Sequence, residues 1–358
     1  MSKDQQKVDV LIVGQGLAGS ALALQLIYRG KKVMVIDQPA NNRSSRVAAG
    51  LFNPVTGMGI VKTWMEEPVF SYLHEFYAEA EKFLNEKFFF TQLLYRPFGT
   101  IEEQNNWMAK STDPTVSNLM ADVFTTSHFS NQVHDPFGGL LIKNAGYIDS
   151  PAFLKAVQSY LIANQSYWES HFNSNELVLN NEGISYQHIV ADYTVMCTGI
   201  NSLAPFFDWL PIRSLKGETL TISMKESPEM LLNKGVYVVP TDQLNLYKAG
   251  ATYSLKELSP ATTIEGENEI KEKLGALLKT PFEIVGQDWG IRPTTVDRKP
   301  ILGSHPVHPK LVIFNGLGTK GVSLAPYFSN QLANWLLEKD EIIKEVNINR
   351  FKPLYSKS

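Results

Sequence analysis

Three glycines near the start of the chain have the spacing that lets backbone amides approach a phosphate group. Gly14, Gly16 and Gly19 form the pattern Gly-x-Gly-x-x-Gly, with Leu17 and Ala18 between the last two. The first glycine of such a pattern permits a tight turn, the second admits a pyrophosphate, and the third lets a helix lie close to a strand. The N-terminus of that helix adds partial positive charge. The pattern predicts contacts with an adenine dinucleotide, provided that a strand precedes it and a helix follows it.

The flanking sequence supplies both elements. Residues 8–13 form an apolar run interrupted only by Asp9, which is typical of a parallel strand buried on both faces. Helical periodicity runs from Ser20 to Arg29, and Gly30 follows as a helix terminator. A second apolar strand at 33–36 completes the unit. We therefore predict a nucleotide-binding βαβ unit rather than a chance glycine turn.

An acidic residue closes this unit. Asp37 lies 23 residues after the first glycine, close to the distance at which dinucleotide-binding folds place a carboxylate that accepts ribose hydroxyls. Its neighbour Gln38 is a further predicted cofactor contact. A carboxylate here would repel the extra phosphate of NADP, but the pattern alone leaves FAD and NAD open.

The segment after the second strand combines basic, hydroxyl and small side chains. Arg43, Ser44 and Ser45 precede Ala49-Gly50-Leu51. This segment resembles the Ala-Gly-Met/Ile pattern of the D-amino-acid oxidase, glycine oxidase and sarcosine oxidase superfamily of flavoproteins. In that superfamily the segment runs beside the pyrophosphate and under the isoalloxazine ring. The resemblance implies that these six residues contact FAD.

The resemblance continues in order along the chain, whereas segments 66–144 and 206–284 match only loosely. Gly146 to Asp149 is similar to the family's return into its FAD domain, and Gly290-Ile291-Arg292-Pro293 precedes a closing flavin signature. By this resemblance, the strand ending near residue 199 and the closing signature contribute Cys197, Thr198, Gly199, Gly316, Leu317, Gly318, Thr319, Lys320 and Gly321 to the FAD site.

The closing signature also has a physical interpretation of its own. A short apolar strand at 311–314 leads into a glycine-rich loop and then a helix, with Pro326 expected in the first turn. A helix N-terminus stabilises the negative charge that a flavin gains at N1 and the C2 carbonyl on reduction. Lys320 either reinforces this effect or is a solvated loop lysine.

Two residues are candidates for contacts with a substrate. Arg292 matches the arginine that binds the substrate carboxylate in glycine and D-amino-acid oxidases, and a guanidinium offers two parallel charge-assisted bonds to a carboxylate. The alternative is a structural arginine paired with Asp297 or Asp288. Tyr237 matches an active-site tyrosine of the same family, although aromatic residues in strands usually belong to the core.

A lysine is the third catalytic candidate. Lys248 stands where sarcosine oxidase-like enzymes place a lysine above the flavin that promotes reaction with oxygen. A lysine in a strand of apolar residues is unfavourable unless it is paired or solvated, so a solvent-facing position is the alternative interpretation.

Composition excludes several classes of protein. The 358 residues are 44% hydrophobic and 19% charged, with 33 Lys and Arg against 36 Asp and Glu, so nothing favours disorder or nucleic-acid binding. His305 and His308 lack a nearby third ligand, and we predict no metal site. The N-terminal segment is too short and polar for a membrane span or a secretory signal. We expect a cytoplasmic protein.

The single cysteine limits how the cofactor is held. Cys197 permits no internal disulfide and lies at the end of a predicted buried strand, where a small apolar role is favoured. Some sarcosine oxidases tether their flavin through a cysteine near the closing signature, where this chain has none. FAD is therefore expected to bind without a covalent bond.

The order of the motifs predicts an α/β architecture. We expect a Rossmann-like FAD-binding domain of the glutathione reductase type with an inserted α+β substrate domain on a mostly antiparallel sheet. The FAD domain is discontinuous, over 1–65, 145–205 and 285–358, and the substrate domain covers 66–144 and 206–284. Within the latter we expect a helix over 70–83 and strands over 88–98, 218–223 and 235–250.

The resemblance implies a reaction class. We expect FAD-dependent oxidation of an amine, such as an amino acid or N-substituted glycine, by hydride transfer to flavin N5, imine hydrolysis and reoxidation by oxygen. Three alternatives remain open. They are a dehydrogenase using a quinone or protein acceptor, a tRNA-modifying flavoenzyme of the same superfamily, and a binding module that uses its dinucleotide only for structure.

Overall fold

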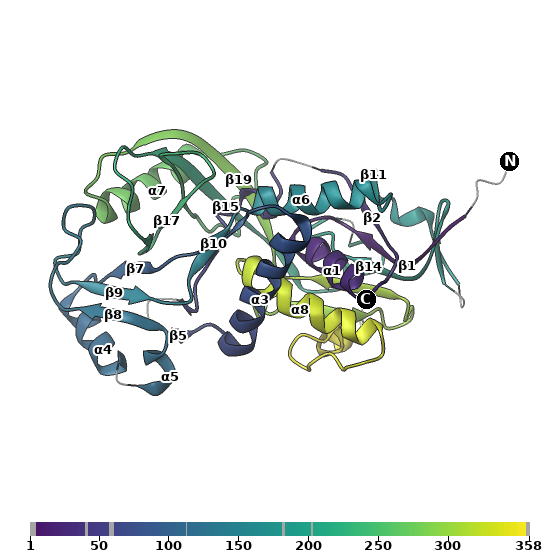
Figure 1. Cartoon of the computed structure of the whole chain (residues 1–358). Helices are drawn as coiled ribbons and strands as arrows, with labels where there is room; N and C mark the ends of the chain where they lie inside the picture. The colour runs from purple at the N-terminus through teal and green to yellow at the C-terminus, as the bar shows by residue number, and fades with distance from the viewer. Residues whose placement is uncertain are drawn as a thin grey trace.

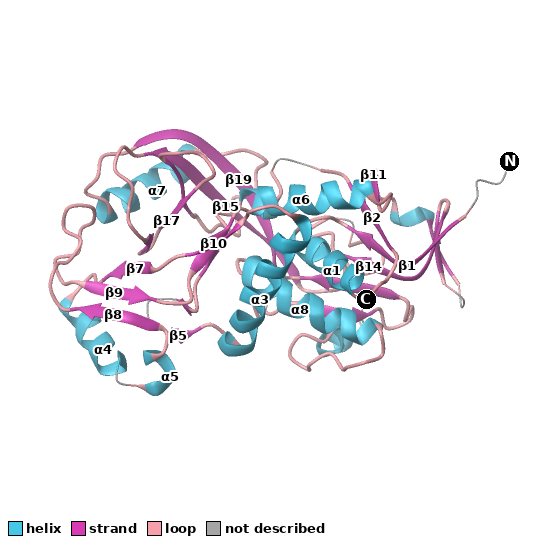
Figure 2. Ribbon diagram, in the orientation of Figure 1, coloured by secondary structure: helices cyan, strands magenta, loops and turns pink. Residues whose placement is uncertain are grey.

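Two large sheets dominate the molecule, which is elongated with one sheet towards each end (Figure 1). The structure is a computed structural model that describes residues 5–39, 42–56, 61–111, 113–180, 183–201 and 203–355. Figure 2 shows the long strands β15 and β19 running from one end of the molecule towards its middle, where the two sheets approach each other. The chain alternates between the sheets, so segments distant in sequence meet at this junction.

The first sheet has the order β11-β2-β1-β14-β13-β12, with β21 beside β14 and β20 beside β21. The pairs β11–β2, β2–β1, β1–β14 and β14–β21 are parallel, as expected for a nucleotide-binding fold. Its strands are β1 (Gln6–Val13), β2 (Val33–Asp37), β11 (Tyr167–Glu169), β12 (Leu177–Leu179), β13 (Ile184–Tyr186), β14 (Ile189–Met196), β20 (Ile301–Ser304) and β21 (Leu311–Asn315).

Four helices share one core with a face of this sheet. The helix α1 is buried around almost its whole circumference because it lies between the sheet and the helix α8. Buried residues of α3 and α6 belong to the same core. The helices are α1 (Leu17–Tyr28), α2 (Ser44–Val47), α3 (Glu66–Leu84), α4 (Ile101–Ser111), α5 (Pro114–Ser117), α6 (Ser150–Ala163), α7 (Ile264–Leu277), α8 (Gly321–Leu336) and α9 (Lys352–Tyr355).

The second sheet has the order β19-β15-β18-β17-β16-β7-β9-β8, and its described pairs are antiparallel apart from β16 with β7. The helix α7 packs on one face through Ile270 and Leu274, while the other face carries the core that includes Trp107 of α4. The strands are β7 (Leu94–Pro97), β8 (Met120–Phe124), β9 (Gly139–Ile142), β15 (Ile212–Ser223), β16 (Leu231–Asn233), β17 (Tyr237–Pro240), β18 (Leu246–Gly250) and β19 (Glu283–Thr295).

Short strands connect these bodies. One small sheet has the order β3-β10-β6, and β4 pairs with β5. The helix α3 packs on α8 and α6. The domain limits predicted from the sequence stay a prediction. The remaining strands are β3 (Leu51–Phe52), β4 (Val55–Thr56), β5 (Val61–Lys62), β6 (Phe89–Thr91) and β10 (Gly146–Ile148).

Three expectations about local structure need correction. The strand expected over 88–98 divides into β6 and β7, which belong to different sheets, and the strand expected over 235–250 is the hairpin β17–β18. Pro326 is the sixth residue of α8 and so lies beyond its first turn. A proline there leaves the carbonyl of Val322 without its helical donor, and the hydroxyl of Tyr77 on α3 donates to that oxygen at 2.9 Å instead.

Within the described ranges, no helix is long and apolar enough to cross a bilayer.

Candidate flavin and substrate site

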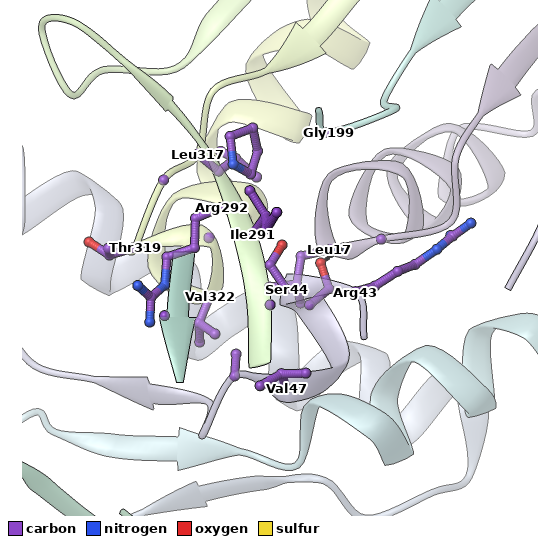
Figure 3. Close-up of a pocket in the computed structure, with 18 of the residues that line it drawn as sticks. Leu17, Arg43, Ser44, Val47, Gly199, Ile291, Arg292, Leu317, Thr319 and Val322 are labelled. Carbon is purple, nitrogen blue, oxygen red and sulfur yellow. Dashed lines mark hydrogen bonds between the residues drawn. The ribbon is translucent and has the colours of Figure 1, made fainter. Parts of the chain in front are cut away.

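A cavity of about 1290 Å³ lies where the two sheets meet, and its lining brings together most of the predicted site residues. It is lined by the glycine-rich segment after β1, the segment around α2, the end of β14, the loop before α8 and one face of the second sheet. Figure 3 shows Leu17, Ser44, Ile291, Leu317 and Val322 facing the same space, although they come from distant parts of the chain.

The first glycine segment has the geometry that its sequence predicts. Gly14 has a φ of 101°, which only glycine adopts readily. A Cβ on Gly19 would lie 1.9 Å from the carbonyl oxygen of Gly14, so the helix lies directly on the turn. The helix α1 begins at Leu17, three residues earlier than expected, and the amide of Leu17 donates to Ser45 Oγ at 3.2 Å. Ser45 thereby connects the α2 segment to the start of α1.

Asp37 is buried at the end of β2 and fits the predicted ribose-binding role. Its Oδ1 accepts a hydrogen bond from the amide of Gln15 at 2.9 Å and an ion pair from Arg43. Its Oδ2 is buried, and the described residues offer it no hydrogen-bond partner. Arg43 also donates to the carbonyl of Gln38. A carboxylate oxygen held in place and left available is what a pair of ribose hydroxyls requires.

The closing loop lies against the first glycine segment. Asn315 donates to the carbonyl of Gly199 at 2.6 Å, which joins the closing signature to the end of β14. The helix α8 begins at Gly321, and a Cβ on this residue would lie 3.2 Å from the side chain of Leu17 at the start of α1. The N-termini of α1 and α8 therefore lie side by side at one cavity.

Lys320 and Cys197 line this part of the cavity, and burial shifts their pKa values in opposite directions. Burial lowers the pKa of Lys320, and the charge of Arg298 lowers it further. A half-buried cation at the start of α8 favours a negatively charged group on the ligand. Burial also raises the pKa of Cys197, whose thiol is therefore held neutral in the apolar role expected for it.

Arg292 lies on the second sheet and faces the cavity without an ion pair to any carboxylate of the described residues. The two candidate partners bind other cations, since Asp288 pairs with Lys248 and Asp297 pairs with Arg350. The Arg292 guanidinium lies over Gly217, where a Cβ would be 2.0 Å from Nη2. In Figure 3 the side chains of Arg292 and Arg43 point to opposite sides of the cavity.

Two other groups surround this guanidinium. Nη1 of Arg292 donates to the carbonyl of Thr252 at 3.3 Å, and the ring of Tyr253 lies 5.0 Å from the guanidinium carbon. Tyr237 lines the same cavity, and burial raises the pKa of its hydroxyl although the charge of Arg292 acts in the opposite direction. Tyr237 is therefore a neutral hydrogen-bonding group near a cation.

The structure does not bring Lys248 into the cavity lining. The residue shares a sheet face with Gly250, two positions further along β18, and pairs with Asp288. Sequence reasoning missed Arg96, Thr219, Asn233, Tyr253 and Trp289, which also line the cavity. Arg96, Thr219, Asn233 and Trp289 lie in strands whose pairing is not apparent from local pattern, and Tyr253 follows β18 outside any strand.

The cavity fits FAD on several independent features. Gly14 and Gly16 line it beside the start of α1, Asp37 presents an unsatisfied oxygen, and buried hydroxyls of Thr198 and Thr294 have no described hydrogen-bond partner. The volume exceeds that of most small-molecule sites, as a dinucleotide together with a substrate would need.

Comparison with known proteins decides between the dinucleotides. Residues 9–335 match the profile of the FAD dependent oxidoreductases called DAO. The chain belongs to this family. The predicted cofactor class and the resemblance stated from the motifs are therefore confirmed, and FAD is the cofactor of this DAO-family protein.

Solved structures confirm the predicted fold class. Glycine oxidase from Geobacillus kaustophilus superposes with a TM-score of 0.75 at 18% identity, covering 94% of this chain and 96% of its own. Iminodiacetate oxidase from Chelativorans sp. gives 0.75 at 18% identity, covering 94% and 98%. L-proline dehydrogenase from P. horikoshii gives 0.69 at 15% identity, covering 98% and 99%.

Curated relatives of this DAO-family chain are longer than it is. The bifunctional protein ThiO/ThiG of Nostoc sp. is 24% identical over 96% of the chain but only 55% of its own length. The bifunctional protein MnmC of Idiomarina loihiensis, named for tRNA 5-methylaminomethyl-2-thiouridine biosynthesis, is 23% identical over 96% of the chain and 59% of its own length. The chain thus spans little more than half of these relatives.

Proposed function

We propose that this protein oxidises an amino acid or an N-substituted glycine at the carbon that bears the amine. The observation that supports this most directly is the guanidinium of Arg292, which faces the cavity. The two acidic residues nearest to it in sequence form ion pairs with other cations, Asp288 with Lys248 and Asp297 with Arg350. A cation kept available in a cavity with the FAD-binding loops fits a substrate carboxylate.

The chain's own residues would orient the substrate. Arg292 would bind the carboxylate through two parallel bonds, and the neutral hydroxyl of Tyr237, on β17 of the same sheet, would donate to it. Bound FAD supplies the acceptor for a hydride from the carbon bearing the amine, and the imine product is hydrolysed by water. The N-terminus of α8 and Lys320 would stabilise negative charge on the reduced cofactor.

We further propose that the first sheet with its helices holds FAD and that the second sheet presents the substrate. The sheet orders and the cavity between them support this division, with the sequence limits given above as the proposed boundaries. Oxygen is the proposed electron acceptor, and the cytoplasm the proposed location. Lys248 stays a proposed promoter of the oxygen reaction, although its pairing with Asp288 leaves it outside the lining.

The test is anaerobic mixing of the FAD-loaded protein with glycine, sarcosine and the D- and L-amino acids while the absorbance of the flavin is followed. We expect at least one of them to bleach it. Arg292→Lys should raise KM for that substrate at least tenfold and leave the FAD content unchanged, because lysine keeps the charge but loses the planar fork. Absence of bleaching by every compound, or loss of FAD from the variant, would contradict the proposal.

A tRNA substrate is the second candidate, favoured by the match to MnmC proteins. The near balance of 33 basic and 36 acidic residues gives it no support from overall charge. Bleaching of the flavin by tRNA carrying a modified wobble uridine, with binding that weakens steeply as salt is added, would replace the first proposal with this one.

A further inference from the structure

A row of residues crosses the cavity-facing side of the second sheet from one strand to the next. Strand pairing places Thr219 opposite Gly250, Gly250 opposite Tyr237, and Tyr237 opposite Asn233. The parallel register between β16 and β7 pairs Leu231 with Leu94 and Leu232 with Tyr95, and its extension by one residue puts Arg96 beside Asn233. Because paired residues share a sheet face, these side chains project into one space.

Arg96 and Arg292 occupy different ends of that space. Both line the same cavity. The Arg292 guanidinium lies over Gly217 of β15, whereas Arg96 lies on β7, with β18, β17 and β16 between these two strands. Four strand spacings of about 4.8 Å separate their backbones by about 19 Å. The guanidinium of Arg292 reaches from β19 over β15, and that of Arg96 is held by Glu103 at the other end of the cavity.

Two basic side chains and one acidic side chain meet at the Arg96 end of the cavity. Nη2 of Arg96 bonds Oε1 of Glu103 at 3.1 Å, and Oε2 of Glu103 accepts the amide of Gly99 at 2.7 Å. Lys234 is held beside them by its bond to the carbonyl of Phe98 at 3.1 Å. Among the described residues, the cations of Arg96 and Lys234 thus lie beside the carboxylate of Glu103, and the side chains of Arg96 and Glu103 are only 15% and 22% exposed. The cations outnumber the carboxylate among these three residues, and partial burial reduces the screening of their charge.

We propose that the Arg96 end of the cavity binds a second anionic group of the substrate, remote from the carboxylate bound by Arg292. This inference rests on the proposed function and narrows its substrate class to amino acids or N-substituted glycines with a distant anionic end. The separation of the two strands favours a chain of several methylene groups over the shortest diacid. A carboxylate and a phosphate share the chemistry that Arg96 recognises.

Binding can be tested without turnover. Linear dicarboxylates from malonate to sebacate, and monocarboxylates of equal length, are titrated into the FAD-loaded protein by calorimetry. We expect affinity to pass through a maximum at an intermediate or long chain, where the dicarboxylate binds at least tenfold more tightly than its monocarboxylate. A parallel series of carboxylates that end in a phosphonate is titrated in the same way. Tighter binding of one series shows which of the two anions this end of the cavity prefers.

Two substitutions that change the local charge in opposite directions test the assignment to Arg96. Arg96→Gln should remove the dicarboxylate advantage and leave monocarboxylate binding within about twofold, whereas Glu103→Gln should tighten dicarboxylate binding several-fold. The matched control is the exposed pair Lys273 and Glu269 on α7, where Lys273→Gln and Glu269→Gln should change neither series. Opposite shifts from two variants of one ion pair are not expected of a general loss of folding.

The outcomes separate this inference from the proposed function. Equal binding of mono- and dicarboxylates at every length, or equal weakening of both series by Arg96→Gln, would overturn it. Dicarboxylate binding that depends on Arg96 in a protein whose flavin no amine reduces would leave the subsite standing and reject the proposed function. Bleaching of the flavin by sarcosine, in a protein that binds dicarboxylates no more tightly than monocarboxylates, would support the proposed function and reject the second anion subsite.

Discussion

Gly19 holds the start of α1 against the turn that precedes it. Because a Cβ there would lie 1.9 Å from the carbonyl oxygen of Gly14, Gly19→Ala must displace either the helix or the turn that approaches FAD. Overpacking of this kind costs about 1–3 kcal/mol. We expect FAD affinity to fall by about tenfold or more, measured by titration of the apoprotein with fluorescence detection.

The matched control for this substitution is Gly275→Ala in α7. A Cβ at Gly275 meets nothing within 4 Å, and alanine favours a helix by about 1 kcal/mol over glycine. The control should therefore bind FAD as the wild type does and unfold at slightly higher denaturant. Equal FAD affinity in both variants would show that close approach at Gly19 is unimportant.

A second residue-scale prediction concerns His305, which is 5% exposed and has a pKa lowered to about 4 by burial and by the charge of His308. Its Nδ1 accepts from the amides of Val307 and His308, both at 3.2 Å, so the ring is held neutral. The unfolded chain binds a proton at this histidine below about pH 6.5, whereas the folded protein does so only near pH 4. Stability is therefore lost as pH falls between these values.

His305→Asn keeps an acceptor near the Nδ1 position and cannot titrate. The free energy of unfolding of this variant should fall less steeply than that of the wild type between pH 6.5 and 4.5, by up to about 1.4 kcal/mol per pH unit. Urea unfolding at several pH values measures the slope. His134→Asn, at an exposed position, is the control that should follow the wild type. Parallel slopes for all three proteins would reject the prediction.

At the scale of elements, a hydrogen bond joins α3 to α8 beside Pro326. Pro326 removes the donor that the Val322 carbonyl would have inside α8, and the fully buried Tyr77 replaces it at 2.9 Å. Tyr77→Phe leaves that carbonyl buried and unsatisfied, which costs about 1–3 kcal/mol. We expect a loss of this size in the free energy of unfolding by urea.

The partner variant Pro326→Ala tests the cause of that loss. Alanine restores an amide donor to the helix, so Tyr77→Phe should cost much less in the Pro326→Ala background than in the wild type. The coupling in this double-mutant cycle isolates the carbonyl from the general packing of the ring. The same loss in both backgrounds would assign the effect to packing alone.

Elements also show what sequence could predict. The strand, glycine turn and helix over 8–29 follow from local pattern, because apolar runs and glycine spacing fix them without distant partners. The second sheet depends on pairing across long sequence separations. The parallel contact of β16 with β7 and the split at Gln92 between β6 and β7 have no local signal, so Arg96 was missed and Lys248 was assigned to the cavity.

At the scale of the whole molecule, FAD is expected to act as a common partner for segments that the chain supplies far apart. The cavity is lined by Gly14 and Gly16, by the Arg43 to Leu51 segment, by Cys197 to Gly199 and by the loop before α8. A ligand that contacts all of them binds only the folded arrangement. By linkage, free FAD at 100 times its Kd stabilises the folded state by about 2.7 kcal/mol.

Hydrogen exchange of the apoprotein and the FAD-loaded protein locates this stabilisation. We expect protection to rise together in the turn after β1 and in the loop before α8, because the starts of α1 and α8 lie side by side and one ligand would hold both. The helix α7 packs on the face of the second sheet away from the cavity and should gain only what global stability adds. In Asp37→Asn, which weakens the ribose contact, the concentration of FAD needed for half-maximal protection should rise at both segments equally. Protection confined to the first segment would mean that the two helix starts do not share one FAD, and the role proposed for the N-terminus of α8 in stabilising the reduced cofactor would then be rejected.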